Sequence, residues 1–293
     1  MNFKNAKELL LLCEAEQRPI SEVMIERECS EGECSREAVL RRMHRALEIM
    51  KHSANAAAEH PAKSMGGLIG GEANRLRGRL AAENSACGTL MTRGIMYAMS
   101  VLEVNAGMGL IVAAPTAGSS GVVPGVLISL QDEYGFSDDE LVKALFNAGA
   151  VGYLAMRNAT VAGAVGGCQA EVGMAAAMAA SAAVELLGGS PAQSLSAAST
   201  VMMNMLGLAC DPVAGLVEYP CQNRNAAGVA NALAAAEMAL SGILSLIPFD
   251  EMLDILYRVG RGLPAELRET ALGGCALSPS ACAECSSGNK GNI

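Results

Sequence analysis

The sequence predicts an all-α protein, a single helical domain in which buried helices rich in alanine, glycine and methionine are joined by functional loops. Two observations indicate this class. Long runs in which β-branched residues alternate with polar ones are missing, and so is the strand–helix–strand rhythm of an α/β protein. Between residues 144 and 247 only seven residues are Asp, Glu, Lys or Arg, which favours tightly packed helices with little solvent exposure.

Residues 1–62 predict an amphipathic helical layer on the outside of this core. The first 60 residues contain nine Lys or Arg and eleven Asp or Glu. Within them, residues 35–57 predict a helix with Ser35 as its N-cap, because apolar residues recur on one face. That face consists of Val39, Leu40, Met43, Leu47 and Met50.

Residues 63–272 form the predicted core, which also carries the candidate site, and residues 273–293 an irregular tail containing cysteines. Further helices are expected at 137–150, with Ser137 as N-cap, and at 250–261, where acidic residues begin the helix and arginines end it. No linker or internal repeat divides the chain, so we expect one domain over residues 1–293.

The composition excludes several classes of function. A formal net charge of -9, with no cluster of Lys and Arg among aromatic residues, argues against binding to nucleic acid. The apolar stretches 101–130 and 161–188 contain Glu103, Gln169 and Glu171, so we expect no membrane span. The N-terminus lacks the pattern of a secretory signal, and we expect a cytoplasmic protein.

Three of the ten cysteines have unusual neighbours. Cys168, Cys210 and Cys221 each adjoin Gly, Pro or a carboxamide residue, in GGCQAE, LACDPVAG and YPCQNRNAAG. Thiolate ligands need backbone freedom and hydrogen-bond donors of this kind, but a free cysteine is also commonly buried, so both readings stay open. With no cluster of histidines or carboxylates nearby in the sequence, sulfur ligation indicates an iron–sulfur cluster or zinc. Three cysteines without a fourth partner favour a cluster with one open iron, which can act as a Lewis acid.

A second group of polar residues lies in VNAGMGLIVAAPTAGSSGVVPG, residues 104–125. Hydroxyls and free backbone N–H groups there predict an anion-binding nest for a substrate carboxylate, formed by Thr116, Ser119 and Ser120. The alternative is an ordinary connection between two helices. The segment is not a phosphate-binding P-loop, because a Gly-Lys pair followed by Ser or Thr is missing.

Four polar residues, 222–225, follow Cys221 directly in an apolar segment. Arg224 and Asn225 are candidate substrate-binding residues, since a guanidinium group can bind a carboxylate through two parallel hydrogen bonds. The alternative for Arg224 is a structural ion pair with Glu218.

The motifs of the chain resemble a known family. The stretches ISEVMIERE (20–28), MGGLIGGEA (65–73), EVNAGMGLIVAAPTAGSSGVVPGVL (103–127), GAVGGCQAEVGMAAAMAA (163–180) and CDPVAGLVEYPCQNRNAAG (210–228) are similar to the alpha subunit of the iron–sulfur-dependent bacterial L-serine dehydratases, also called L-serine deaminases. The resemblance implies a helical alpha domain in which Cys168, Cys210 and Cys221 bind a [4Fe-4S] cluster and the fourth iron is left for substrate. It further implies an ammonia-lyase that converts L-serine to pyruvate and ammonia without pyridoxal phosphate.

In this family a beta part carries a serine- and histidine-containing motif of the SSHT type and helps to complete the active site. No such motif occurs in this chain, so the resemblance implies a separate beta subunit as partner. The general base is not identified in this chain, and the partner is one place for it. The tail departs from the family's usual sequence, so its cysteines, Cys275, Cys282 and Cys285, stay outside the ligand assignment.

Two other functions remain open from the sequence. One is a related cluster-dependent lyase that acts on cysteine or another β-substituted amino acid, because nothing in the sequence determines the leaving group. The other is a non-catalytic metal or redox protein, in which the tail motif Cys282-Ala-Glu-Cys285 supplies a permanent fourth ligand.

Overall fold

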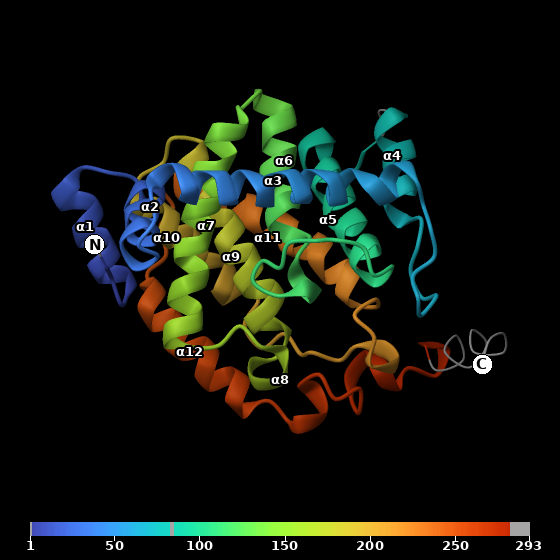
Figure 1. The fold of residues 1–293 in the computed structure, drawn as a ribbon. Coiled ribbons are helices and arrows are strands. Elements are labelled where there is room, and N and C mark those ends of the chain that lie inside the picture. Colours follow the sequence, from blue (N-terminus) through green and yellow to red (C-terminus); the bar gives the residue numbers. More distant parts are fainter. Residues whose placement is uncertain (1, 83–84, 282–293) are drawn as a thin grey trace.

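A computed structural model describes residues 2–82 and 85–281. Within these ranges every regular element is helical, and the one β-bridge, between Cys210 and Arg268, belongs to no strand. The predicted all-α class is therefore confirmed. The α-helices, shown in Figure 1, are α1 (Ala6–Glu16), α2 (Ile20–Glu31), α3 (Arg36–Glu59), α4 (Glu72–Ala81), α5 (Gly88–Ala106), α6 (Val122–Tyr134), α7 (Asp138–Asn158), α8 (Gly163–Gly166), α9 (Met174–Leu186), α10 (Pro191–Asn204), α11 (Cys221–Leu240) and α12 (Phe249–Gly262).

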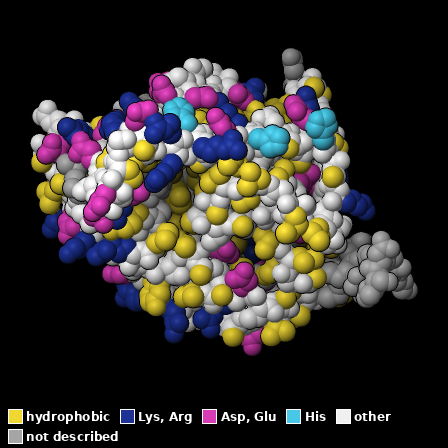
Figure 2. Space-filling model, viewed as in Figure 1, with side chains coloured by type: hydrophobic (Ala, Val, Ile, Leu, Met, Phe, Trp, Pro, Cys, Tyr) yellow, Lys and Arg dark blue, Asp and Glu magenta, His cyan; other side chains and the backbone are white. Residues whose placement is uncertain are grey.

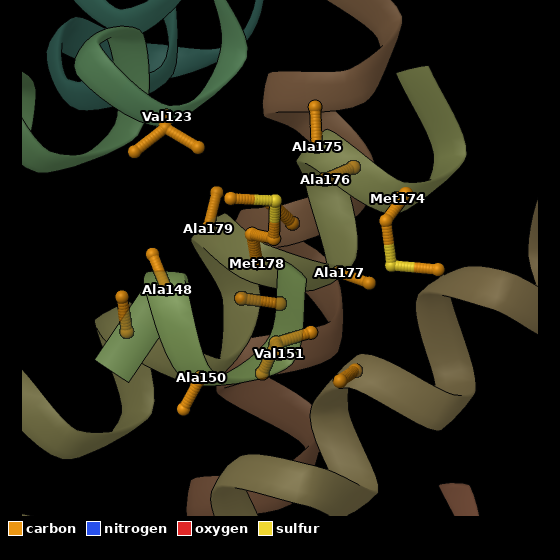
Figure 3. Packing of buried hydrophobic residues seen from close by; sticks show 14 of the residues in the cluster. Val123, Ala148, Ala150, Val151, Met174, Ala175, Ala176, Ala177, Met178 and Ala179 are labelled. Carbon is orange, nitrogen blue, oxygen red and sulfur yellow. The ribbon is translucent and has the colours of Figure 1, made fainter. Parts of the chain in front are cut away.

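Helix α9 lies at the centre of the core and packs against α6, α7, α10 and α11. All of its residues from Met174 to Val184 are buried. Most of them are alanines, whose short side chains let neighbouring backbones approach closely, while methionine fills the remaining gaps. Figure 3 shows the alanines and Met178 of this helix together with Ala148 and Val151 of α7. The predicted Ala- and Met-rich buried helices are present.

Helix α3 begins and ends within two residues of the prediction. Ser35 is its N-cap, and the side-chain oxygen accepts a hydrogen bond from the backbone N–H of Ala38 at 3.2 Å. The apolar face packs on α5 and α7, and Figure 1 shows the helix crossing in front of both. On the same side of the molecule, hydrophobic side chains gather below α3 (Figure 2).

The two other predicted helices also form, with altered lengths. Ser137 and Glu140 make a capping box at the start of α7, which continues to Asn158, eight residues beyond the predicted end at 150. Its apolar face continues through Val151 and Leu154, so burial extends the helix. Helix α12 begins one residue before the predicted start, at Phe249.

The apolar stretches 101–130 and 161–188 are broken by loops and short helical turns. The first contains the end of α5, the 3₁₀ turn η1 (Ala117–Ser119) and the start of α6. The second contains α8, the π-helical turn η2 (Gln169–Gly173) and α9. No helix in the described ranges combines the length and the apolar character needed to span a membrane.

Candidate functional site

Cys168 lies between α8 and the π-helical turn η2, in a backbone shape that requires glycine. Gly167 before it has φ +74°, and a Cβ atom there would lie 2.7 Å from the carbonyl oxygen of Leu208. Isolated π-helical turns are frequent at functional sites, because the extra residue redirects the side chains around it. The segment 167–173 therefore turns sharply and buries Cys168, which is 3% exposed.

Cys210 is held by a segment far from it in the sequence. Its backbone N–H donates to the carbonyl oxygen of Leu267 at 2.8 Å, and its carbonyl oxygen accepts from the N–H of Glu269 at 2.7 Å. Cys221 is the first residue of α11. The site thus unites the turn after α8, the chain after α10, the first turn of α11 and the chain after α12, which gather in the lower part of Figure 1.

The three thiols lie close enough to influence one another. Burial, together with the charges of Cys168 and Glu171, raises the pKa of Cys221 to about 12. Burial, followed by the charge of Cys168, also raises the pKa of Cys210 well above its ordinary range. Burial raises the pKa of Cys168 to about 11, an effect that the Arg224 guanidinium group opposes. The structure therefore brings together the three cysteines that the sequence singled out.

Arg224 reaches back from α11 to the chain beside Cys210. Its Nη2 lies 2.6 Å from Asp211 Oδ1, and its Nη1 donates to the carbonyl oxygen of Ala209 at 2.8 Å. The alternative ion pair with Glu218 is therefore wrong. The reason is the direction of the first turn of α11, which points the guanidinium group toward Asp211 and Cys168.

Glu218 instead stabilises the glycine-rich turn after α3, residues 64–71. It accepts hydrogen bonds from Ser64 Oγ at 2.7 Å and from the backbone N–H groups of Gly66 at 2.7 Å and Leu68 at 3.0 Å. A buried carboxylate with three donors is well compensated and serves structure.

Thr116 faces the cysteines, whereas the two serines after it shape the turn. Thr116 Oγ1 donates to Glu171 Oε1 at 2.9 Å. Ser119 forms a capping box with Thr116, and Ser120 Oγ donates to the carbonyl oxygen of Ala117 at 2.7 Å. Both serines are fully buried, so their hydroxyls stabilise the turn around Thr116.

Asn225 joins this turn to α11. Its Oδ1 accepts from the N–H of Gly121 at 3.1 Å, and its Nδ2 donates to the carbonyl oxygens of Gly118 at 2.8 Å and Cys221 at 2.9 Å. With the amide group committed to backbone partners, Asn225 positions the Thr116 turn beside Cys221.

Glu171 is the site residue that the sequence reasoning missed. The sequence showed no cluster of carboxylates near the cysteines and gave the single Glu171 no role, but Glu171 Oε2 lies 3.7 Å from Cys210 Sγ. A Cβ atom on Gly163 would lie 2.4 Å from the same oxygen, so a side chain there would displace it. Burial raises the pKa of Glu171, and the nearby Glu269 raises it further. The available signal was that Glu171 is one of only seven charged residues between 144 and 247.

The tail approaches the site at Cys275. The backbone N–H of Cys275 donates to Asp211 Oδ2 at 2.6 Å, so the tail is attached to the carboxylate that pairs with Arg224. Cys275 also lines a cavity of about 440 Å³ together with Leu68 and Tyr219. Cys282 and Cys285 lie outside the described residues.

The donor type at the site fits an iron–sulfur cluster, which proteins hold through cysteine thiolates. In the described part of the chain, no three His, Cys, Asp or Glu side chains converge closely enough to hold one metal ion. A cluster needs a different geometry, because each cysteine binds a separate iron. The thiols of a cluster site therefore lie further apart than those that bind one metal ion. Of the other described cysteines outside the tail, Cys13 belongs to α1, Cys29 to α2, Cys34 to the loop between α2 and α3, and Cys87 is the N-cap of α5.

Comparison with known proteins shows the family of the chain. The sequence profile of the family described as "Serine dehydratase alpha chain" matches residues 15–276, a range that contains all three cysteines, Glu171 and Arg224. The chain belongs to this family. It is 45% identical over 277 residues to the "Probable L-serine dehydratase, alpha chain" of Bacillus subtilis, which covers 94% of this chain and 92% of that protein.

Two further relatives show how the family varies in length. The "L-serine dehydratase, alpha chain" of Peptoniphilus asaccharolyticus is 40% identical over 276 residues, with 94% of each chain covered. The "L-serine dehydratase" of Streptomyces coelicolor is 36% identical over 281 residues, which span 94% of this chain but 61% of that protein. The family therefore contains members of about this length and longer single chains, and its named members are enzymes of the lyase class.

Proposed function

We propose that this chain is the alpha subunit of an L-serine dehydratase that holds a [4Fe-4S] cluster on Cys168, Cys210 and Cys221 and converts L-serine to pyruvate and ammonia. The observation that carries the proposal is the meeting of these three buried thiols from distant parts of the chain, with Cys168 close enough to raise the pKa of both Cys210 and Cys221. The names of the relatives support L-serine as the substrate.

The surroundings of the thiols suit a positively charged inorganic group. Burial favours the neutral thiol, so a ligand set of this kind gives up its protons only when a metal replaces them. The Arg224 guanidinium group beside Cys168 favours the thiolate form. When bound, a cluster with one iron not ligated by the chain supplies a Lewis acid for the departing hydroxyl group of the substrate.

The residues of this chain would bind and orient the substrate. We expect Thr116 and Arg224 to contact it, because Thr116 bonds to Glu171 and Arg224 lies beside Cys168. Ser119, Ser120 and Asn225 support them by fixing the turn at residues 116–121. Removal of the Cα proton and loss of water would leave an enamine, which hydrolyses to pyruvate and ammonia. We place the base that takes this proton on the partner subunit.

A separate beta subunit completes the proposed enzyme. Relatives of about this length are named alpha chains, while the longer Streptomyces coelicolor protein has additional sequence that this chain does not match. We infer that a second polypeptide supplies the equivalent part here, carrying the SSHT-type motif.

The test is to purify the chain without oxygen together with a partner encoded in a neighbouring reading frame, and to measure pyruvate formed from L-serine. We expect turnover that needs iron and both chains. L-cysteine and other β-substituted amino acids, assayed in parallel, identify the preferred leaving group. An iron-loaded complex that forms no pyruvate from L-serine contradicts the proposal.

A further inference from the structure

Glu171 is poorly compensated for a carboxylate that lies largely inside the protein. Glu103 and Glu218, both buried, each accept two hydrogen bonds from backbone N–H groups and one from a side chain. Asp211 pairs with Arg224. Glu171 has one hydrogen bond of ordinary length, from a hydroxyl group, and a long contact with a thiol. An ionised carboxylate has about four acceptor positions, so most of those on Glu171 remain free.

Among the described residues, the groups that act on the pKa of Glu171 are Thr116, Cys210 and Glu269, and none of them is a cation. Glu269 adds a second negative charge to the same place. An ionised, partly buried carboxylate in such surroundings is costly unless it takes up a proton or a cation binds to it. Glu171 is only partly exposed, yet it is not sealed inside the core.

Glu171 lies directly beside the cysteine site. Oε1 is fixed by Thr116, and Oε2 points toward Cys210 Sγ. Arg224, the cation nearest the cysteines among those described above, is already paired with Asp211. A zwitterionic amino acid bound in this site would therefore lie beside Glu171, a carboxylate that forms no ion pair within the described residues.

We propose that Glu171 binds the α-ammonium group of the amino-acid substrate. The inference rests on the proposed function and adds the residue that distinguishes an α-amino acid from the corresponding α-hydroxy acid. An ammonium group offers three hydrogen-bond donors and a full positive charge. It can therefore donate to the open acceptor positions of Glu171 and neutralise the carboxylate. Thr116 then acts on Glu171 by holding its carboxylate in one orientation.

The test compares two ligands that differ only at the proposed contact. L-glycerate has a hydroxyl group where L-serine has its ammonium group. In the iron-loaded complex with its partner, we measure the KM for L-serine and the inhibition constant of L-glycerate for the wild type, Glu171→Gln and Glu185→Gln. Glu185 is a matched control, since it is another carboxylate with a pKa raised by burial, bonded to Asn147 near the C-terminal end of α9, whereas Glu171 precedes the start of α9.

Glu171→Gln is expected to raise the KM for L-serine about tenfold to a hundredfold, the range for losing a charged hydrogen bond. In Glu171→Gln the inhibition constant of L-glycerate and the iron content should stay within about twofold of the wild type, and the Tm within a few degrees. Glu185→Gln should behave as the wild type in every measurement. If Glu171→Gln does not fold, Glu171→Asp keeps the charge at a shorter reach and should show the same contrast between the two ligands.

Equal weakening of both ligands, or loss of iron from Glu171→Gln, overturns the inference and gives Glu171 a role in holding Cys210. An unchanged KM for L-serine also overturns it. These outcomes are distinct from failure of the proposed function, in which the wild-type complex itself forms no pyruvate from L-serine.

Discussion

The buried thiols keep their protons to an unusually high pH in the metal-free chain. Burial raises the pKa of Cys168 to about 11 and that of Cys221 to about 12, whereas a cysteine in an unfolded chain titrates near 8.5. The folded state therefore binds more protons than the unfolded state above about pH 9, and its free energy of unfolding falls as the pH rises.

This predicts a measurable difference between the wild type and Cys168→Ser. Under reducing conditions without iron, the free energy of unfolding of the wild type should decline between about pH 8 and pH 10.5, and the decline should be smaller in Cys168→Ser. Urea denaturation at several pH values measures both. Equal declines in the two proteins would mean that the Cys168 thiol is not protected by burial.

Individual residues also show which features could be predicted from the sequence and which could not. Ser35 and Ser137 cap their helices as predicted, because capping depends on residues within one turn. The partners of Arg224 and the place of Glu171 depend on chain segments that meet only in the folded protein. For this reason the sequence identified the cysteines but assigned Arg224 a wrong alternative partner and overlooked Glu171.

At the level of helices, the site depends on close packing between α5, α6 and α11. The first turn of α11 carries Cys221, Arg224 and Asn225, and the helix packs along α5 and α6. A Cβ atom on Gly125 of α6 would lie 2.7 Å from the carbonyl oxygen of Gly94 on α5. The composition predicted that such helices exist, but not which small residues face one another.

A pair of glycine substitutions tests this packing. Gly125→Ala should lower the free energy of unfolding by about 1–3 kcal/mol, because the added methyl group overpacks the contact. Gly78→Ala, on α4, has no atom within 4 Å of the new Cβ and should raise stability by about 0.5–1 kcal/mol. Chemical denaturation measures both. Equal changes of the same sign would contradict the packing described.

On the scale of the whole molecule, this chain carries only part of the proposed active site. In the proposed enzyme this chain would contribute the cysteines and the residues around them, and the partner would contribute the base. We therefore predict that the iron-loaded chain alone forms no pyruvate from L-serine and that adding the partner restores turnover. A coupled assay on the chain, the partner and the mixture checks this. If the chain alone is as active as the mixture, the base lies in this chain and the division of the site is wrong.

The most direct test of the central claim is the iron and sulfide content of the chain after reconstitution without oxygen, in the wild type, Cys221→Ser and Cys13→Ser. Cys13 is a buried cysteine of α1, away from the site, and serves as the control. We predict about four irons and four sulfides per chain in the wild type and in Cys13→Ser, and a clear loss of both in Cys221→Ser. Full iron in Cys221→Ser, or no iron–sulfur cluster in the wild type, would contradict the account.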